Sequence, residues 1–235
     1  VYVVETSDRE EGTRMLLGEF GDIDFRDKSV ALKANFNSAD PPPASTHLDT
    51  LEELMGYLRD AGAGDVTLAE RCGMGDTGAV LVSTGGHDLG ERLGFTVINL
   101  EDLPADEWVK VDADWLSWND GFHIAKVFRE SDRVIQTCCL KTHRYGGHFT
   151  MSLKNSVGLV AKKAPGDSHD YMQELHTSPL QRIMIGEINA FYDVDLAIMD
   201  AVEAFTTGGP AKGDLVRPGL MLASRDRVAL DAVGI

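Results

Sequence analysis

The chain has 235 residues, of which 43% are hydrophobic, 26% charged and 7% aromatic. This length allows one large domain or two small ones, with a hydrophobic core that needs no disulfide or metal ion. The composition is ordinary for a globular protein and excludes a disordered, collagen-like or coiled-coil chain.

The net charge is strongly negative. Asp and Glu number 38 against 22 Lys and Arg, which gives a formal charge of −16 and a pI near 4.7. Such a surface repels phosphate backbones and anionic membranes. We therefore expect no nucleic acid among the partners of this protein.

The cysteines and the hydropathy indicate the compartment. Cys72, Cys138 and Cys139 do not make a disulfide framework, which favours a reducing environment. Three cysteines are too few for an iron–sulfur cluster held by four cysteines of one chain, so we expect no such cluster. No apolar run approaches the roughly 20 residues that a membrane-spanning helix needs. We expect a cytoplasmic protein without a membrane span, although export by means of a removed signal stays open.

Short apolar segments alternate with helical patterns in the first half of the chain. A helix is expected to begin near Thr46, because Leu48, Leu51, Leu54 and Leu58 follow at helical spacing, and to end near Gly62. The other elements predicted here are strands at 29–33, 65–72 and 95–100 and a short helix at 87–93.

The second half continues in the same way. The predicted helices are 125–130, 148–159 and 180–191, with a last one that begins near Asp226. The predicted strands are 133–140, 194–199 with a short extension at 202–205, and 220–223, with a turn at 208–210.

Strands separated by 10–15 residues of helical pattern are typical of a mostly parallel sheet with helices on both faces. We predict a single three-layer α/β domain over residues 1–235. The last predicted helix has only ten residues, so the domain could continue beyond Ile235 or a second copy could cover this end. A homo-oligomer is therefore an open alternative.

The densest polar cluster follows the strand predicted at 133–140. It reads Lys-Thr-His-Arg-Tyr-Gly-Gly-His over residues 141–148, and Lys154 and Asn155 come soon after. Ligands of open α/β sheets bind beyond the carboxyl ends of the strands. Gly146 and Gly147 would expose backbone N–H groups at a helix start, which favours an anion. A carboxylate or phosphate ligand is expected here, the alternative being a solvated loop whose cations pair with nearby acids.

Several other polar residues follow predicted strands and could converge on the same crevice. His143 and His148 are candidates for acid/base work or metal binding, because imidazole titrates near neutral pH. Carboxylates can bind a hard divalent cation or act as a base, and otherwise they cap helices or form ion pairs. The remaining strand-end candidates are Lys33, Asn35, Glu70 and Asp200.

A glycine-rich segment supports a different hypothesis. Residues 73–78 match the G-x-G-x-x-G pattern of dinucleotide-binding proteins, and Glu101 follows at a strand end as the acid that would hold a ribose. The helix that should follow is interrupted at Gly85 and Gly86. A glycine-rich loop without a ligand is the alternative.

Lys141-Thr142-His143, Lys154-Asn155 and Gly158 together resemble the bacterial and archaeal family called domain of unknown function 362. Its members typically have an apolar strand that ends in Lys-Thr-His, followed by a Lys-Asn-x-x-Gly helix. The resemblance covers about residues 28–235, although Lys33-Ala34-Asn35 stands where the family usually has Lys-Pro-Asn. Further features that fit are Ala61-Gly62-Ala63, Asp200, Gly209-Pro210, Asp226, Ala229 and Asp231.

The resemblance implies membership but no single activity, because the family has no settled reaction. Many members carry a ferredoxin-like cluster segment, which does not carry over to a chain with three cysteines. The segment from His143 to Lys154 is also similar to the glycine-and-lysine segment of nickel-pincer lactate racemases. In those enzymes a lysine tethers the cofactor, and histidines bind nickel or do acid/base work. The analogy implies that a lysine and the histidines of this segment have the same roles.

The leading hypothesis is an enzyme that binds a small anionic metabolite in a strand-end crevice, with a divalent metal as an optional cofactor. The alternatives are a non-catalytic module for a redox partner, a dinucleotide-dependent oxidoreductase and a racemase-like enzyme, so catalysis itself stays open. The candidate catalytic residues are His143, Lys154 and Glu70. The candidate ligand-binding residues are Lys33, Asn35, Lys141, Thr142, Asn155, Gly146 and Gly147, and the candidate metal ligands are Glu70, Asp200 and His148.

Overall fold

The fold is built on one twisted mixed sheet. The computed structural model describes residues 1–144, 148–163, 165–166 and 168–235. Along the sheet the strands are β1 (Tyr2–Glu5), β11 (Leu220–Ser224), β9 (Leu196–Gly208), β7 (Arg133–His143), β2 (Val30–Lys33), β3 (Val66–Glu70) and β4 (Thr96–Asn99). The neighbours from β9 to β4 pair in parallel, whereas β11 pairs antiparallel with β9 and β1 pairs antiparallel with β11. The prediction of a mostly parallel sheet is confirmed.

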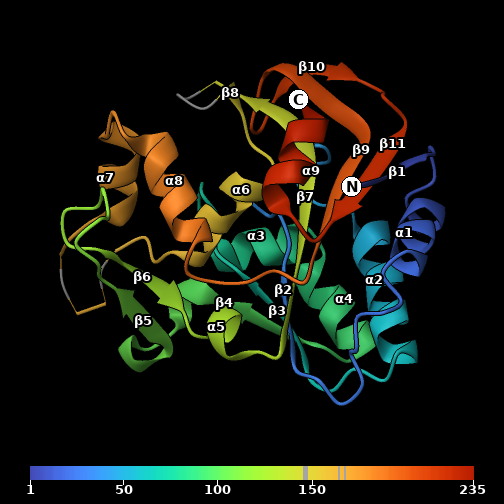
Figure 1. The fold of residues 1–235 in the computed structure, drawn as a ribbon, viewed down its shortest axis with the longest axis horizontal. Helices are drawn as coiled ribbons and strands as arrows, with labels where there is room; N and C mark the ends of the chain where they lie inside the picture. Colours follow the sequence, from blue (N-terminus) through green and yellow to red (C-terminus); the bar gives the residue numbers. More distant parts are fainter. Residues whose placement is uncertain (145–147, 164, 167) are drawn as a thin grey trace.

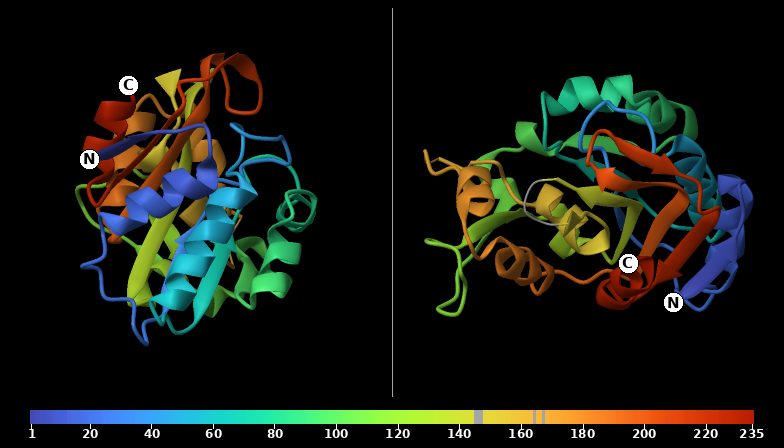
Figure 2. Two further views of the ribbon diagram at one scale, coloured as in Figure 1. Left: turned by 90° about the vertical axis from the view of Figure 1, so that its right-hand side faces the viewer. Right: turned by 90° about the horizontal axis from the view of Figure 1, so that it is seen from above.

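Helices cover both faces of the sheet (Figure 1 and Figure 2). One face carries α1 (Arg9–Gly18), α2 (Leu48–Asp60), α3 (Thr77–Ser83) and α4 (Gly86–Leu93). The other carries α6 (Ser152–Asn155), α8 (Gln181–Asn189) and α9 (Arg227–Gly234), together with the ribbon of β5 (Trp108–Val111) and β6 (Phe122–Ala125). Two further helices, α5 (Val127–Glu130) and α7 (Tyr171–Thr177), lie on the side of this ribbon.

The strand sequences explain the three layers. Leu32 and Leu68 pack into the core beneath α1 and α2, while Ala31 and Ala69, one residue earlier or later, pack into the core on the opposite face. Side chains alternate between the two faces of a strand, so a sheet buried on both sides needs apolar residues at every position. All four residues of β2 are buried.

The segment between Lys141 and Leu159 differs from the predicted helix over 148–159. His148–Phe149 forms a short strand, β8, whose residues pair with Thr142 and His143 at the end of β7. The helix begins only at Ser152, and Ser156–Leu159 continues as a 3-10 turn. That prediction was wrong at its start, because pairing with β7 satisfies the backbone there.

A second difference concerns β9, which is one strand of 13 residues rather than two short segments. Its far end pairs with β10 (Gly213–Val216). The chain turns at Gly208 and Gly209, and a Cβ atom on Gly209 would lie 1.9 Å from the carbonyl oxygen of Thr142. This close approach brings the turn against the end of β7.

The sequence analysis did not predict β1, α1, α3, β5, β6, α7 or β10. Helix α1 is capped by Asp8, whose carboxylate accepts a hydrogen bond from the backbone N–H of Glu11, and the helix buries Leu16 and Leu17. Within the described residues, no helix is long and apolar enough to cross a membrane.

Candidate functional site

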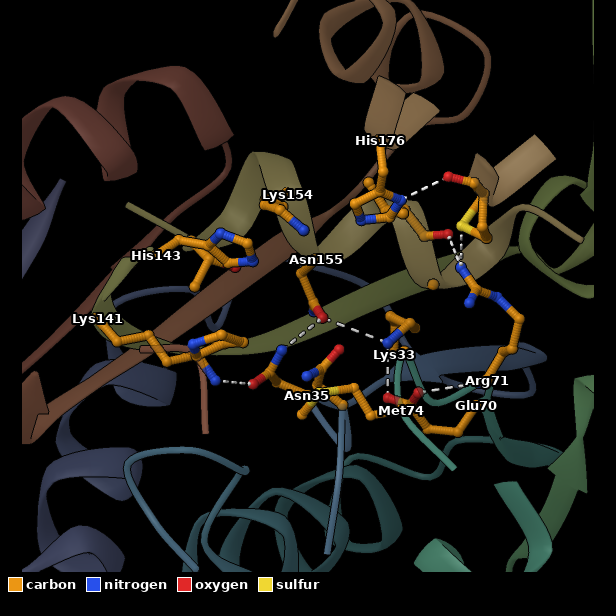
Figure 3. Close-up of a pocket in the computed structure, with 17 residues that line it drawn as sticks. Lys33, Asn35, Glu70, Arg71, Met74, Lys141, His143, Lys154, Asn155 and His176 are labelled. Carbon is orange, nitrogen blue, oxygen red and sulfur yellow. Dashed lines mark hydrogen bonds and ion pairs between the residues drawn. The ribbon is translucent and has the colours of Figure 1, made fainter. Parts of the chain in front are cut away.

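A cavity of about 320 Å³ lies beyond the carboxyl ends of β2, β3 and β7. Figure 3 shows its side chains pointing inward from these strands and from the segment that contains α6. The structure brings seven of the predicted site residues together in its lining, namely Lys33, Asn35, Glu70, Lys141, His143, Lys154 and Asn155.

A buried ion pair forms part of the cavity floor. Lys33 Nζ donates to Glu70 Oε1 at 2.6 Å, and both side chains are at most 2% exposed. Glu70 also accepts hydrogen bonds from the backbone N–H groups of Phe36, at 3.3 Å, and Arg71, at 3.0 Å. Burial raises the pKa of Glu70 and lowers the pKa of Lys33, while their mutual attraction opposes both changes. Glu70 therefore fixes Lys33 in place.

Lys141 enters the cavity from β7 without an acidic partner among the described residues. Its Nζ donates to Asn35 Oδ1 at 2.6 Å and to the carbonyl oxygen of Ala44, both of which are neutral acceptors. The side chain is 2% exposed, and burial lowers its pKa. A buried ammonium group held only by neutral oxygens favours a nearby anion.

Asn155 joins the two lysine groups. Its Oδ1 accepts from Lys33 Nζ and from Asn35 Nδ2, each at 3.3 Å, while its Nδ2 donates to the carbonyl oxygen of Thr137 at 3.1 Å. The amide is buried and bonded on both sides. Asn155 therefore fixes the position of α6 against β7 and beside the cavity floor.

Lys154 directly precedes Asn155, but its amine takes no part in the hydrogen bonds that hold Lys33, Lys141 and Asn155. Its side chain lines the cavity and makes no hydrogen bond or ion pair to a described residue. Burial lowers the pKa of Lys154 to about 8, and the positive charges of Arg71 and Lys141 act in the same direction. The cavity thus contains an amine that has no partner among the described residues and that lies close to two other cations.

Arg71 is a site residue that the sequence analysis missed. Its Nη1 and Nη2 donate to the carbonyl oxygens of Cys72, at 3.1 Å, and Val157, at 2.5 Å, while its buried Nε has no partner among the described residues. Burial lowers the pKa of this guanidinium. Arg71 directly follows Glu70 at the end of β3, and this position could have indicated a site residue. The strand predicted over residues 65–72 instead places Arg71 inside a strand.

The other missed lining residues come from loops and from α7. They are Asn37, Gly73, Met74, Thr150, Val157, Gly158, Met172, His176 and Pro210. His176 Nδ1 lies 2.6 Å from the carbonyl oxygen of Met172 one turn earlier in α7. Since the sequence pattern did not indicate α7, nothing placed this histidine at the site. His143, in contrast, lies where it was expected, buried at the end of β7.

Comparison with known proteins gives the family. Residues 30–235 match the family described as "Domain of unknown function (DUF362)". The chain belongs to the DUF362 family. No curated protein matches this DUF362 chain.

The fold also matches a solved structure, that of the lactate racemase apoprotein from Thermoanaerobacterium thermosaccharolyticum. The TM-score is 0.59 at 15% sequence identity, over 97% of this chain and 55% of the racemase chain. At this identity the likeness concerns the fold alone. The DUF362 chain spans about half the length of the racemase.

Two of the three candidate metal ligands lie away from the cavity of this DUF362 protein. Asp200 Oδ2 accepts a hydrogen bond from Arg9 Nε at 2.6 Å, and its Oδ1 accepts from the backbone N–H of Val202 at 2.9 Å. His148 is exposed on β8, and Glu70, the third candidate, is paired with Lys33. The described residues contain no group of three or more His, Cys, Asp and Glu that could hold a metal ion.

The remaining candidate ligand-binding residues are not part of the described lining. Thr142 lies on β7 with its hydroxyl buried and without a hydrogen-bond partner among the described residues. Gly146 and Gly147 lie outside the described residues, so the anion site predicted on their backbone stays a prediction.

The glycine-rich segment at 73–78 has local structural roles. A Cβ atom on Gly73 would lie 2.2 Å from Asn37 Oδ1, and Asp76 caps α3 by accepting from the backbone N–H of Ala79. Glu101 forms an ion pair with Lys162 at 2.9 Å and accepts a hydrogen bond from the Thr77 hydroxyl. These contacts give Glu101 a structural role that does not require a bound ribose. The loop is built to pack beside the cavity.

Proposed function

We propose that the cavity binds a small metabolite that carries a carboxylate or phosphate group. Among the described residues of the lining, four side chains are basic (Lys33, Arg71, Lys141 and Lys154) and Glu70 is the one acid. The whole chain carries a formal charge of −16, so this local excess of positive charge is opposite to the rest of the molecule. A low-dielectric cavity increases the attraction between such cations and an anion.

The single observation that carries the proposal is the amine of Lys154, which has no partner in the part of the chain that the structure describes. Lys154 is partly buried. Removing a cation from water without giving it a partner is costly, and a carboxylate or phosphate oxygen would supply that partner. Lys141 and Arg71 lie close enough to affect Lys154 electrostatically, so they can share the same anion. Lys33 is already neutralised by Glu70 and contributes structure more than charge.

His143 supports catalysis in addition to binding. It lines the same cavity as Lys154, and an imidazole can donate or accept a proton near neutral pH. We assign it the role of general acid/base on the bound metabolite. A binding module with the same cavity would bind the anion and show no turnover.

The binding test compares Lys154→Met with the wild type by calorimetry, with inorganic phosphate and pyruvate as probes. A charge-assisted hydrogen bond contributes about 1.5–3 kcal/mol, so we expect affinity to fall by at least about tenfold. Lys163→Met is the matched control, because Lys163 is exposed and does not line the cavity. Equal affinity of Lys154→Met and the wild type for both probes would exclude this function for Lys154.

A second candidate, a racemase-like enzyme with a tethered nickel cofactor, is supported by the fold likeness to the lactate racemase apoprotein. The cavity offers a lysine amine for the tether and His143 and His176 as imidazoles. The described residues offer no three-donor set for a bare metal ion, so nickel would depend on the cofactor for most of its ligands. Intact mass of the native and the denatured protein, with elemental analysis, decides this case. A covalent addition accompanied by nickel would support it, and the bare polypeptide mass would oppose it.

A further inference from the structure

We propose that Lys154 is a catalytic nucleophile that forms an imine with the carbonyl group of a small oxo acid. This inference rests on the proposed function, because it takes the bound anion to be the carboxylate of that oxo acid. It adds a covalent step and a substrate class, namely a carboxylate with a neighbouring ketone or aldehyde.

Lys154 differs from the other lysines of the cavity because no acceptor among the described residues holds its amine. Lys33 Nζ is bonded to Glu70, Ala34 and Asn155, and Lys141 Nζ is bonded to Asn35 and Ala44. Lys154 has no such acceptor among the described residues. A nucleophilic amine must be unprotonated and unobstructed, so Lys154 is the one of the three that fits.

The surroundings of Lys154 favour its neutral form. The side chain is partly buried in the cavity, where Arg71 and Lys141 act as nearby positive charges. Desolvation and neighbouring cations are the two effects that activate lysines toward carbonyl compounds. The pKa of about 8 leaves an appreciable fraction of free amine at slightly alkaline pH.

The backbone that carries Lys154 is held at both sides. Asp231 accepts hydrogen bonds from the backbone N–H groups of Ser152 and Leu153, at 2.8 and 2.9 Å. On the other side, Asn155 is bonded to Lys33, Asn35 and the carbonyl oxygen of Thr137. A fixed backbone limits the amine to a small volume, which favours attack on a bound carbonyl carbon.

The step is balanced without an oxidant or reductant. The Lys154 amine adds to the carbonyl carbon of the oxo acid, whose carboxylate contacts Lys141 or Arg71, and gives a carbinolamine. The carbinolamine hydroxyl then takes a proton from His143, acting as the general acid, and leaves as water, which gives the protonated imine. His143, in the same cavity, would pass protons between the amine and the departing oxygen.

The test is reductive trapping. The protein is incubated at pH 8 with pyruvate and sodium cyanoborohydride, which reduces an imine to a stable secondary amine, and the adduct is located by peptide mass spectrometry. We expect modification of Lys154 at pyruvate concentrations that leave Lys163 unmodified. Phosphate should slow the trapping, because it would occupy the anion site.

Two variants separate nucleophilicity from charge. Lys154→Arg keeps a positive charge but cannot form an imine, so it should lose trapping, whereas Lys163→Met should trap as the wild type does. If pyruvate binds by calorimetry but no adduct forms at Lys154, or if an adduct forms equally on surface lysines, the imine is overturned and the proposed anion site stands. If neither phosphate nor pyruvate binds and nothing is trapped, both proposals fail.

Discussion

Asp231 accepts a hydrogen bond from the backbone N–H of Ser152 at 2.8 Å, and this contact fixes the start of the helix that carries Lys154. A second bond, from the backbone N–H of Leu153 at 2.9 Å, occupies the other carboxylate oxygen. The first N–H groups of a helix have no intrahelical partner, so Asp231 satisfies two of them. The last helix of the chain therefore positions a residue of the candidate site.

This contact predicts a pH dependence of stability. Burial raises the pKa of Asp231 to about 6 from the usual 3.8, although the two backbone N–H bonds oppose the change. A folded-state pKa above the unfolded value means that the folded state binds the proton more tightly, so the associated stability is present below about pH 4 and is lost as the pH rises through 6. At 1.36 kcal/mol per pKa unit, the loss is at most about 3 kcal/mol.

The measurement is urea unfolding of the wild type and Asp231→Asn between pH 4 and pH 7. Asparagine does not titrate, so the free energy of unfolding of the variant should rise relative to that of the wild type as the pH increases. Other titrating groups are the same in both proteins and cancel in the difference. A constant difference across this range would contradict the assigned pKa change.

A second prediction concerns the reactivity of Lys154. Because its pKa is about 8, compared with about 10.4 for an unperturbed lysine, its labelling by an amine-reactive reagent should reach half-maximal rate near pH 8. A bound anion stabilises the ammonium form, so saturating phosphate should move this midpoint upward. Peptide-resolved mass spectrometry at a series of pH values measures both. A midpoint unmoved by phosphate would mean that the anion does not bind beside this amine.

Where the chain is regular, the sequence was enough to predict which side chains line the cavity. Lys33, Glu70, Lys141 and His143 follow buried apolar runs, and parallel strands bring their carboxyl ends to one edge. That rule alone was enough to bring these side chains together. Asp200 failed to join them because β9 continues past it to Gly208, which places Asp200 inside a strand and opposite Arg9.

The rest of the lining could not be predicted because it depends on tertiary contacts. His176 and Met172 reach the cavity on α7, a seven-residue helix whose capping residue, Asp170, gives little signal in a sequence. Pro210 arrives through the turn between β9 and β10, which packs against Thr142. Such contacts between distant segments leave no local periodicity to detect.

A third prediction concerns the buried pair of Lys33 and Glu70. Replacing Glu70 with Gln leaves the ammonium of Lys33 buried without its counter-charge, which costs about 3–5 kcal/mol in comparable cases. The measurement is the free energy of unfolding from urea denaturation at pH 7. The double variant Lys33→Met with Glu70→Gln removes both charges and should recover much of the loss. If the single and the double variants are equally destabilised, the pair does not act as a unit.

The last prediction tests how tightly Lys33 is packed. A Cβ atom on Gly158 would lie 2.6 Å from Lys33 Cε and 2.9 Å from Lys33 Nζ, so Gly158→Ala must displace a lysine that is held by Glu70. Overpacking of this kind costs about 1–3 kcal/mol, and we expect weaker phosphate binding as well, because the cavity floor moves.

Gly186→Ala is the matched control, since a Cβ atom there meets nothing within 4 Å and the residue lies inside α8. That change should leave phosphate affinity unaltered and stabilise the fold by about 0.5–1 kcal/mol, which is the usual gain of alanine over glycine in a helix. Urea unfolding and calorimetry on the two variants separate the expected effects, and equal stability of the two would show that Lys33 moves aside without cost.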